Sequence, residues 1–133
     1  MCLRPRDWPE KLAPGRAAFL ASFGFAWQGI TYVLRTQRNA RIHLAIACLV
    51  LAAAILLRLS AGELATLLLC MMMVFTAEMM NTVVEAVVDL VTLEYHPGAK
   101  IAKDVAAGAV LVSAGGAVLV GMLIFAPHLH LIW

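Results

Sequence analysis

Three carboxylates and one amide lie within twelve residues of a segment that is otherwise strongly apolar. They are Glu78, Asn81, Glu85 and Asp89, and the residues between them are mostly methionine, valine and alanine. At about 100° per residue, these four side chains fall in a stripe about 80° wide on one face of an α-helix. Ionisable groups inside a membrane helix are costly and by default indicate a functional site. This stripe is therefore the first candidate for the chemistry of the protein.

Carboxylates at different depths of a membrane helix predict different roles. A carboxylate within the acyl region could take a proton from a lipid hydroxyl, as a general base does. Carboxylates at the water boundary could hold Mg²⁺, which prefers oxygen ligands and bridges substrate phosphates. Lys103 and the arginines within residues 35–41 could neutralise phosphate charge. The pattern favours phosphoryl transfer between a lipid head group and a charged, water-soluble co-substrate.

The composition is that of a small integral membrane protein. The chain has 133 residues, of which 63% are hydrophobic and 14% charged, whereas soluble domains carry about 25% charged residues. A net charge of +2 is too small to suggest a nucleic-acid partner. The sequence contains neither a GxxxxGK[ST] loop nor a kinase-type glycine loop. Any nucleotide site would therefore be unconventional.

The helices that position the stripe are predicted from the apolar runs of the sequence and from its helix-breaking residues. Residues 1–15 hold three prolines and no apolar run, which predicts a flexible leader rather than a signal peptide. Residues 16–37 predict an amphipathic helix in the membrane interface; packing on another protein element is the alternative. Spans are expected at about 42–59, 64–93 and 100–126. The fold class is thus an all-α membrane protein with one domain over 16–133, a surface helix and three transmembrane helices.

The breakers set the expected ends of these spans. Pro97 and Gly98 are expected to break the chain between the second and third spans, and Pro127 to end the third. His43 and His96, which flank the spans, are interpreted as interfacial residues rather than ligands.

Basic residues predict the orientation of the chain. Seven Lys or Arg precede the first span, one follows it, two follow the second span, and none follows the third. The N-terminus is therefore expected in the cytoplasm and the C-terminus outside. The apolar helix from Leu64 to Ala77 is about 21 Å long, so Glu78 falls in the cytoplasmic third of a core about 30 Å thick. Glu85 then lies near the cytoplasmic interface and Asp89 beyond it.

Several motifs together resemble one family of membrane enzymes. They are ExxNTxxExxxD over residues 78–89, EYH at 94–96, AKDxAAGAV at 102–110, FAWQG at 25–29 and RNxRIH at 38–43. This set is similar to the prokaryotic diacylglycerol kinase family, which are small integral-membrane lipid kinases of the bacterial inner (plasma) membrane. The resemblance runs from about Arg16 to the C-terminus. The RNxRIH and EYHP segments look more like the undecaprenol kinase branch than the diacylglycerol branch.

The resemblance implies a lipid alcohol as acceptor, ATP with Mg²⁺ as donor, and a homotrimer whose active sites are shared between subunits. By motif, Glu78 would be the base, Asn81 would orient the reacting groups, and Glu85 would bind metal. ATP contacts are implied at Arg16, Glu85, Glu94, Lys103 and Asp104. Contacts with the lipid substrate are implied at Trp27, Arg38, Asn39, Glu78 and Asp89.

One position departs from the family pattern. Family members commonly carry a glutamate directly before the RN segment, where it helps Glu85 with metal, and here Gln37 occupies that position. An amide oxygen can bind Mg²⁺ but brings no charge. Gln37 is therefore included as a candidate ligand beside Glu85.

Two readings from other classes compete with a lipid kinase. A proton- or cation-conducting protein could use the same acidic stripe, but it would need polar groups through the whole bilayer, and residues 64–77 offer only Thr66, Cys70 and Thr76. A non-catalytic scaffold that packs through small residues leaves the stripe unexplained. Within the kinase reading, diacylglycerol is the alternative to undecaprenol as acceptor.

Overall fold

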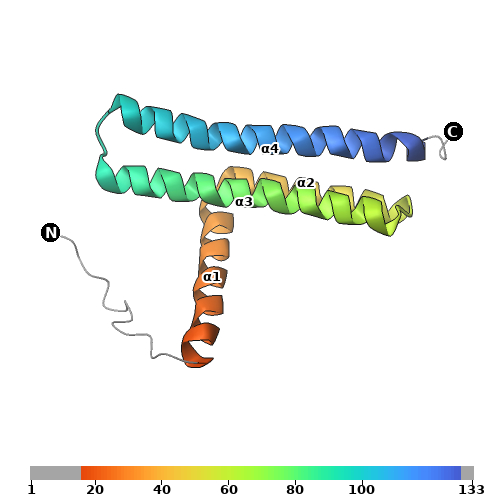
Figure 1. Cartoon of the computed structure of the whole chain (residues 1–133), viewed down its shortest axis with the longest axis horizontal. Helices are drawn as coiled ribbons and strands as arrows, with labels where there is room; N and C mark the ends of the chain where they lie inside the picture. Colours follow the sequence, from red (N-terminus) through yellow and green to blue (C-terminus); the bar gives the residue numbers. More distant parts are fainter. Residues whose placement is uncertain (1–15, 130–133) are drawn as a thin grey trace. The chain divides into compact units, whose positions relative to one another are not determined.

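The structure, a computed structural model, describes residues 16–129, and these form four α-helices without a strand. The helices are α1 (Arg16–Thr36), α2 (Arg38–Leu56), α3 (Ala61–Val91) and α4 (Pro97–Leu129) (Figure 1). The all-α prediction is confirmed. The leader predicted for residues 1–15 lies outside the described residues.

Three of the helices are long and apolar enough to cross a membrane: α2, α3 and α4. The 31 residues of α3 correspond to about 46 Å, which exceeds a hydrocarbon core of about 30 Å. One end of α3 must therefore extend beyond the acyl region if the helix crosses it upright.

The chain divides into two compact units, residues 1–32 and 33–133. In the first unit, α1 exposes large aromatic side chains: Phe19, Phe23 and Trp27 are each more than 60% exposed. The rings of Phe19 and Phe23 meet edge to face, with centroids 5.1 Å apart. An apolar face of this kind suits a membrane interface, and the surface position of α1 stays a prediction.

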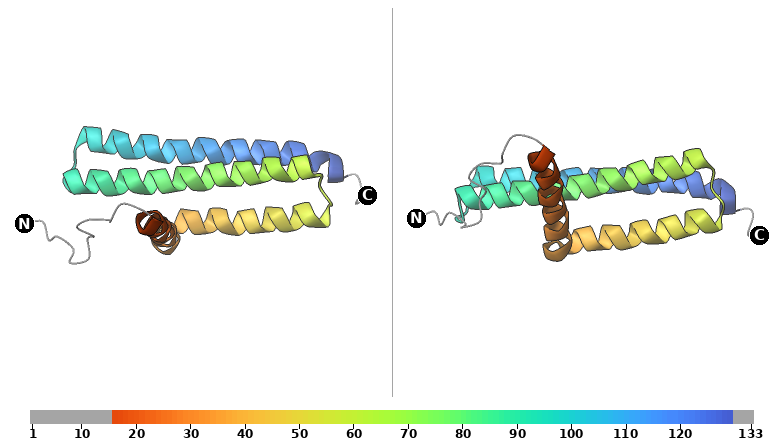
Figure 2. Two further views of the ribbon diagram at one scale, coloured as in Figure 1. Left: turned by 60° about the horizontal axis from the view of Figure 1, so that its bottom comes forward. Right: turned by 90° about the horizontal axis from the view of Figure 1, so that it is seen from below.

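In the second unit, α3 is the central helix, because it contacts both α2 and α4. The helices α3 and α4 run side by side in opposite directions, and α2 lies along α3 (Figure 2). Buried apolar residues of these three helices are few and small or medium in size: Ala40 and Ala54 of α2, Leu67 and Val74 of α3, and Val110 of α4. Small side chains allow membrane helices to approach closely. Most other apolar side chains face outward, as expected of a chain surrounded by lipid or by other subunits.

The turn between α2 and α3 is fixed by two hydrogen-bonded motifs. Arg58 has a φ of 54°, and the N–H groups of Arg58 and Leu59 donate to the carbonyls of Ile55 and Ala54 at 3.1 and 3.0 Å. This is a Schellman motif, which pairs the last carbonyls of a helix. The first span therefore ends at Leu56, three residues earlier than expected.

The two prolines act differently from expectation. Pro97 is the first residue of α4 rather than a breaker before it, because its missing N–H and fixed φ suit the first turn. Pro127 lies inside α4, so the expectation that it ends the helix is wrong. A proline removes one backbone hydrogen bond, here the one to the carbonyl of Leu123, and the helix continues for two more residues.

Candidate active site

Glu78 is the most deeply buried large side chain of the described residues, with 2% of its surface exposed. It lies on α3, in the part of the helix that carries the polar stripe. The Thr82 hydroxyl, one turn further on, donates to the backbone carbonyl of Glu78 at 2.9 Å and not to its carboxylate. The local helix therefore does not satisfy this carboxylate.

The imidazole of His43, on α2, is the charged or titratable group that contacts Glu78. Its Nε2 lies 3.3 Å from the Oε1 of Glu78, yet Oε1 is buried without an aligned hydrogen bond. The short distance shows that the groups touch, and the missing alignment means that the contact is not a formed hydrogen bond. Unsatisfied buried polar atoms are rare in native proteins and require a specific explanation.

Asn81 and Glu85 form the second part of the stripe. The side-chain amide of Asn81 donates to Oε1 of Glu85 at 2.9 Å, across one helical turn. The other end of the amide, Oδ1, is buried and has no partner within residues 16–129. Asn81 therefore orients the Glu85 carboxylate while keeping one acceptor available.

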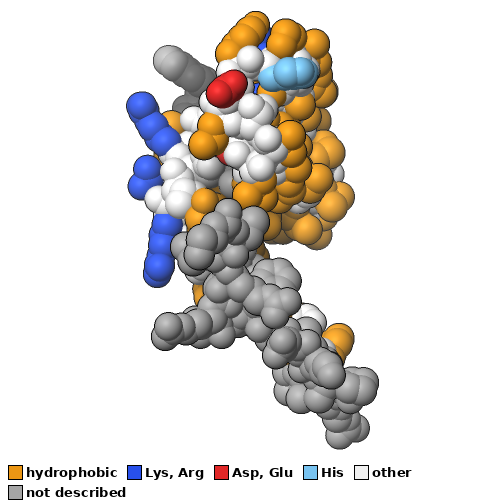
Figure 3. Space-filling model, turned by 90° about the vertical axis from the view of Figure 1, so that its left-hand side faces the viewer, with side chains coloured by type: hydrophobic (Ala, Val, Ile, Leu, Met, Phe, Trp, Pro, Cys, Tyr) orange, Lys and Arg blue, Asp and Glu red, His pale blue; other side chains and the backbone are white. Residues whose placement is uncertain are grey.

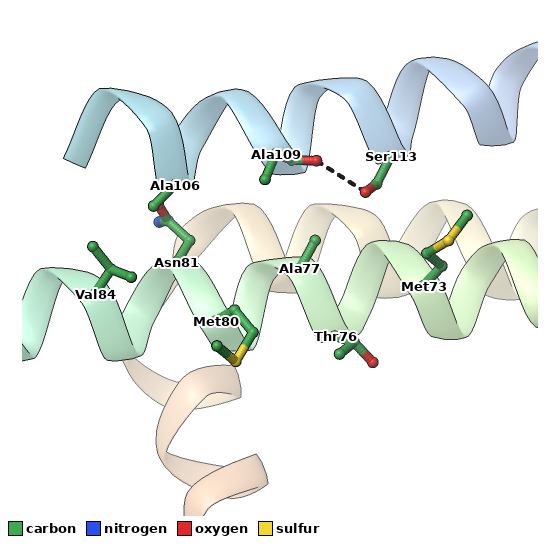
Figure 4. A pocket seen from close by; sticks show the side chains of 9 residues that line it. All are labelled: Met73, Thr76, Ala77, Met80, Asn81, Val84, Ala106, Ala109 and Ser113. Atoms are coloured by element: carbon green, nitrogen blue, oxygen red, sulfur yellow. Dashed lines mark hydrogen bonds between the residues drawn. The ribbon is translucent and has the colours of Figure 1, made fainter. Parts of the chain in front are cut away.

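An open pocket of about 500 Å³ lies beside Asn81, between α3 and α4. Figure 4 shows Asn81 pointing towards Ala106 of α4, with Val84 on one side and Ala77 on the other. The walls are almost entirely apolar, and the hydroxyl of Ser113 is bonded to the Ala109 carbonyl at 2.9 Å. Asn81 is thus the main polar group that a molecule in this pocket would meet.

The water-facing end of the stripe joins α3 to α4. The ammonium group of Lys103 lies 2.6 Å from Oδ1 of Asp89, and Lys100 pairs with Asp104 along α4. Both members of the Lys103–Asp89 pair are about half exposed, so the pair contributes at most about 1 kcal/mol to stability. Figure 3 faces this end, where acidic, basic and histidine side chains interrupt the apolar surface.

The remaining predicted residues are dispersed. Arg38 and Asn39 are exposed in the first turn of α2, and Glu94 is exposed in the turn after α3. Trp27 is exposed on α1, in the first of the two compact units. Arg16 is the first residue of α1, and its side chain lies outside the described residues.

Gln37 caps the N-terminus of α2 through its backbone, and its side chain makes no capping hydrogen bond. The described part of the chain contains no group of three or more His, Cys, Asp or Glu side chains arranged to hold a metal ion. Glu85 and Gln37 therefore remain predicted ligands, and a metal would have to take most of its ligands from substrate or water.

His43 was missed as a site residue. Its sequence signal is weak, because a histidine at the start of a span is usually interfacial and because its contact with Glu78 joins residues 35 positions apart. The one signal that relates His43 to Glu78 is predicted depth, since both residues fall in the same third of the predicted bilayer.

A second, apolar groove of about 590 Å³ runs between α2, α3 and α4. His43 lines one end of this groove, and its other walls include Val50, Leu67, Met71 and Phe125. A long hydrocarbon chain has the right chemistry to occupy such a groove, with its polar end near His43.

Known proteins resemble this chain over most of its length. Residues 24–125 match the prokaryotic diacylglycerol kinase family. A Synechocystis protein named diacylglycerol kinase is 47% identical over 96% of this chain and 70% of its own length. A Bacillus subtilis undecaprenol kinase is 45% identical over 84% of this chain and 90% of its own. A Pseudomonas aeruginosa diacylglycerol kinase is 30% identical over 79% and 85%.

The family match and these relatives cover the acidic stripe, the His43 contact and the pair of Lys103 with Asp89. The buried carboxylate, the amide beside it and the charged end of α3 and α4 thus belong to a part of the chain shared with named kinases. The chain belongs to the prokaryotic diacylglycerol kinase family of lipid kinases.

Proposed function

We propose that this protein transfers the γ-phosphoryl group of ATP to undecaprenol at the cytoplasmic face of the bacterial inner membrane. The observation that carries the proposal is the carboxylate of Glu78, which is buried on an apolar helix with one oxygen unsatisfied. A membrane protein has few reasons to keep such a group unless it acts on a substrate. A hydroxyl at the end of a hydrophobic chain is the donor that this oxygen lacks.

Glu78 accepts the hydroxyl proton of the lipid while the lipid oxygen attacks the γ-phosphorus of ATP. The apolar groove that ends at His43 supports this placement, because it offers room for the lipid chain beside the histidine that contacts Glu78. General-base assistance of this kind contributes about 10² to 10⁴ in rate. ADP leaves with the bridging oxygen, and the phosphate remains on the lipid.

Asn81 and Glu85 would position the donor. Glu85 is partly exposed and held by Asn81, which suits one carboxylate ligand to Mg²⁺, an ion that keeps waters and takes substrate phosphates as ligands. One carboxylate therefore fits such an ion, with Gln37 as a candidate neutral ligand. Bound Mg²⁺ supplies charge neutralisation on the phosphates. The free Oδ1 of Asn81 remains an acceptor for a donor other than the reacting hydroxyl, such as a water bound to the metal ion.

The other predicted residues divide between the two substrates. Charged residues near the end of α3 and the start of α4 are assigned to ATP, together with the N-terminal arginine. These are Arg16, Glu94, Lys103 and Asp104, beside Glu85. Residues at the membrane boundary are assigned to the lipid head and its surroundings. These are Trp27, Arg38, Asn39 and Asp89, beside Glu78.

Undecaprenol is the proposed acceptor, and diacylglycerol is the second candidate. The RNxRIH and EYHP segments and the Bacillus subtilis relative support undecaprenol. The name and the 47% identity of the Synechocystis relative favour diacylglycerol. The two acceptors differ in the width of the chain region and in head group, and a direct comparison separates them.

We also propose a homotrimer with shared sites, an N-terminus in the cytoplasm and a C-terminus outside. The 18-residue window of α4 that is apolar enough to span a membrane has no buried residue in a single chain. Further subunits would cover such a helix and would add walls to the open pocket beside Asn81. Cross-linking of the purified protein in lipid, followed by mass measurement, tests the subunit number.

A phosphotransfer assay tests the function. The full chain is purified, reconstituted in lipid vesicles with ATP and Mg²⁺, and given undecaprenol or diacylglycerol as separate acceptors. We expect labelled phosphate in undecaprenyl phosphate, with a kcat/KM above that for diacylglycerol. A higher value for diacylglycerol would reverse the substrate assignment, and no transfer to either lipid would reject the kinase.

The same vesicles test the conducting alternative. A pH-sensitive dye inside vesicles without ATP would report proton flow driven by an imposed gradient. We expect no flow above that of empty vesicles, because the first half of α3 carries an apolar sequence in which Thr66 already donates to the Gly62 carbonyl.

A further inference from the structure

The buried position of Glu78 creates a problem that the proposed reaction does not solve by itself. Phosphoryl transfer from ATP to an alcohol releases one proton, since the alcohol loses its hydrogen and neither product takes it up at neutral pH. If Glu78 takes that proton, it must lose it again before the next lipid can react. With 2% of its surface exposed, the carboxylate has almost no water to receive it.

The groups around Glu78 leave one route. On α3, the Thr82 hydroxyl donates its hydrogen bond to a backbone carbonyl, and the Asn81 amide donates to Glu85. Among the described residues of α4, no charged or titratable side chain forms an ion pair or hydrogen bond with Glu78. On α2, the His43 imidazole touches Oε1 at 3.3 Å.

His43 is less enclosed than Glu78 and lies near the charged first turn of α2. A quarter of its side chain is exposed, compared with 3% for that of Glu78, and it lies in the second turn of α2, close to the exposed Arg38 and Asn39. An imidazole has two nitrogens and can accept a proton on one while releasing a proton from the other. Among the ion pairs formed by the described residues, the contact with His43 is the one that involves the Glu78 carboxylate.

We propose that His43 relays the proton of each turnover from Glu78 to water; the inference rests on the proposed kinase function. The lipid O–H bond breaks, and its proton joins the Glu78 carboxylate while the lipid oxygen bonds to the γ-phosphorus. The proton then passes from Glu78 to Nε2 of neutral His43, which becomes imidazolium. Loss of the Nδ1 proton to water and exchange of the tautomer restore both groups.

The relay predicts a kinetic effect that differs from that of a positioning residue. Without His43, the Glu78 carboxylate can still accept the first proton and the first turnover proceeds, but the proton then stays on the base. His43→Gln and His43→Ala are compared with the wild type by rapid mixing of the full chain in vesicles with ATP, Mg²⁺ and lipid alcohol. We expect the first turnover within about threefold of the wild type and steady-state turnover at least about tenfold slower.

Imidazole added to the buffer provides a second readout. The His43→Ala change opens space beside Glu78, so free imidazole can carry the proton, and we expect it to restore most of the steady-state rate. His43→Gln fills that space and should respond far less. The matched control is His128→Gln, a histidine near a carboxylate at the other end of the helices, and it should keep both phases and show no imidazole response.

The outcomes separate the inference from the function on which it rests. If the wild type transfers phosphate but both phases fall equally in the His43 variants without imidazole rescue, His43 only positions Glu78 and the relay is wrong. Unchanged steady-state turnover in both variants also overturns it. Absence of transfer by the wild type rejects the kinase and the relay together. Helix content from circular dichroism shows whether the variants remain folded, and imidazole rescue of His43→Ala reports the relay independently of any loss of folded protein.

Discussion

The helix α3 carries two carboxylates that each face a histidine, one in its first turn and one past its middle, and the two pairs are built differently. Near its N-terminus, Glu63 accepts hydrogen bonds from the backbone N–H and the hydroxyl of Ser60 at 2.8 and 2.7 Å. Its other oxygen lies 3.8 Å from Nε2 of His128. In the second half of α3, Glu78 touches His43 at 3.3 Å, yet its Oε1 has no aligned hydrogen bond.

The comparison separates a carboxylate that caps a helix from one for which we propose a role in the reaction. Glu63 completes a capping box with Ser60, which satisfies N–H groups at the start of the helix. Glu78 is more deeply buried and less well satisfied, although burial makes an unmade hydrogen bond more costly. A group that is both buried and unsatisfied is best explained by a partner that arrives with the substrate.

Substituting Glu78 tests this distinction most strongly. Glu78→Gln removes the base while keeping the size of the side chain, and we expect kcat to fall by about 10³-fold. The matched change Glu63→Gln should leave kcat within about twofold, because that carboxylate is committed to a helix cap. Phosphotransfer to the lipid alcohol measures both, and a near-normal rate in Glu78→Gln would reject the proposed base.

Glu85 should show a smaller loss with a different signature. Glu85→Gln keeps the Asn81 contact but removes the charge that would hold Mg²⁺, and we expect a loss of about 100-fold in kcat/KM for ATP. More Mg²⁺ should be required for half-maximal rate. A titration of activity with Mg²⁺ checks this, and an unaltered Mg²⁺ requirement would remove Glu85 from the metal site.

Lys103 should affect the nucleotide rather than stability. Lys103→Met breaks the exposed pair with Asp89, which is worth at most about 1 kcal/mol, but we expect KM for ATP to rise about tenfold through lost phosphate pairing. Arg58→Met removes a charge in the turn at the other end and should leave KM for ATP unchanged. Steady-state kinetics at varied ATP make the comparison, and equal KM values for the two variants would contradict it.

The smallest expected effect is at the structural end. Ser60→Ala removes the cap of α3 and should cost about 1 kcal/mol of stability without altering kcat. Thermal unfolding in detergent measures the first quantity and the lipid assay the second. Should kcat fall as well, the cap of α3 and the Glu78 site would be coupled, and the contrast between them would not hold.

The sequence predicted the helices and the stripe because both depend on local periodicity. Apolar runs indicated three spans, and the 3.6-residue period placed Glu78 and Glu85 on one face of α3. The contact of His43 with Glu78 depends on how α2 packs against α3, which no local pattern encodes. The same limit applies to Pro127, because a helix can continue through a proline at the loss of one hydrogen bond.

Features of the turns were also beyond local patterns. A sequence reading expects glycine in a left-handed cap, so Arg58 with a φ of 54° gave no signal. The pairing of Lys103 with Asp89 required the antiparallel packing of α3 and α4. Charged residues were therefore identified as a set, while their partners were not.

The unbroken course of α3 from Ala61 to Val91 makes the position of the base sensitive to chain length in two separable ways. One residue inserted before Glu78 would turn the carboxylate by about 100° and shift it by only about 1.5 Å. Four inserted residues would return it to within about 40° of its original face but move it about 6 Å along the axis. Single insertions would thus test how activity depends on the face of α3 that carries Glu78. Insertions of a full turn would test how activity depends on its depth along the helix. In evolutionary terms, this segment should tolerate exchange of its apolar residues far better than any change in their number.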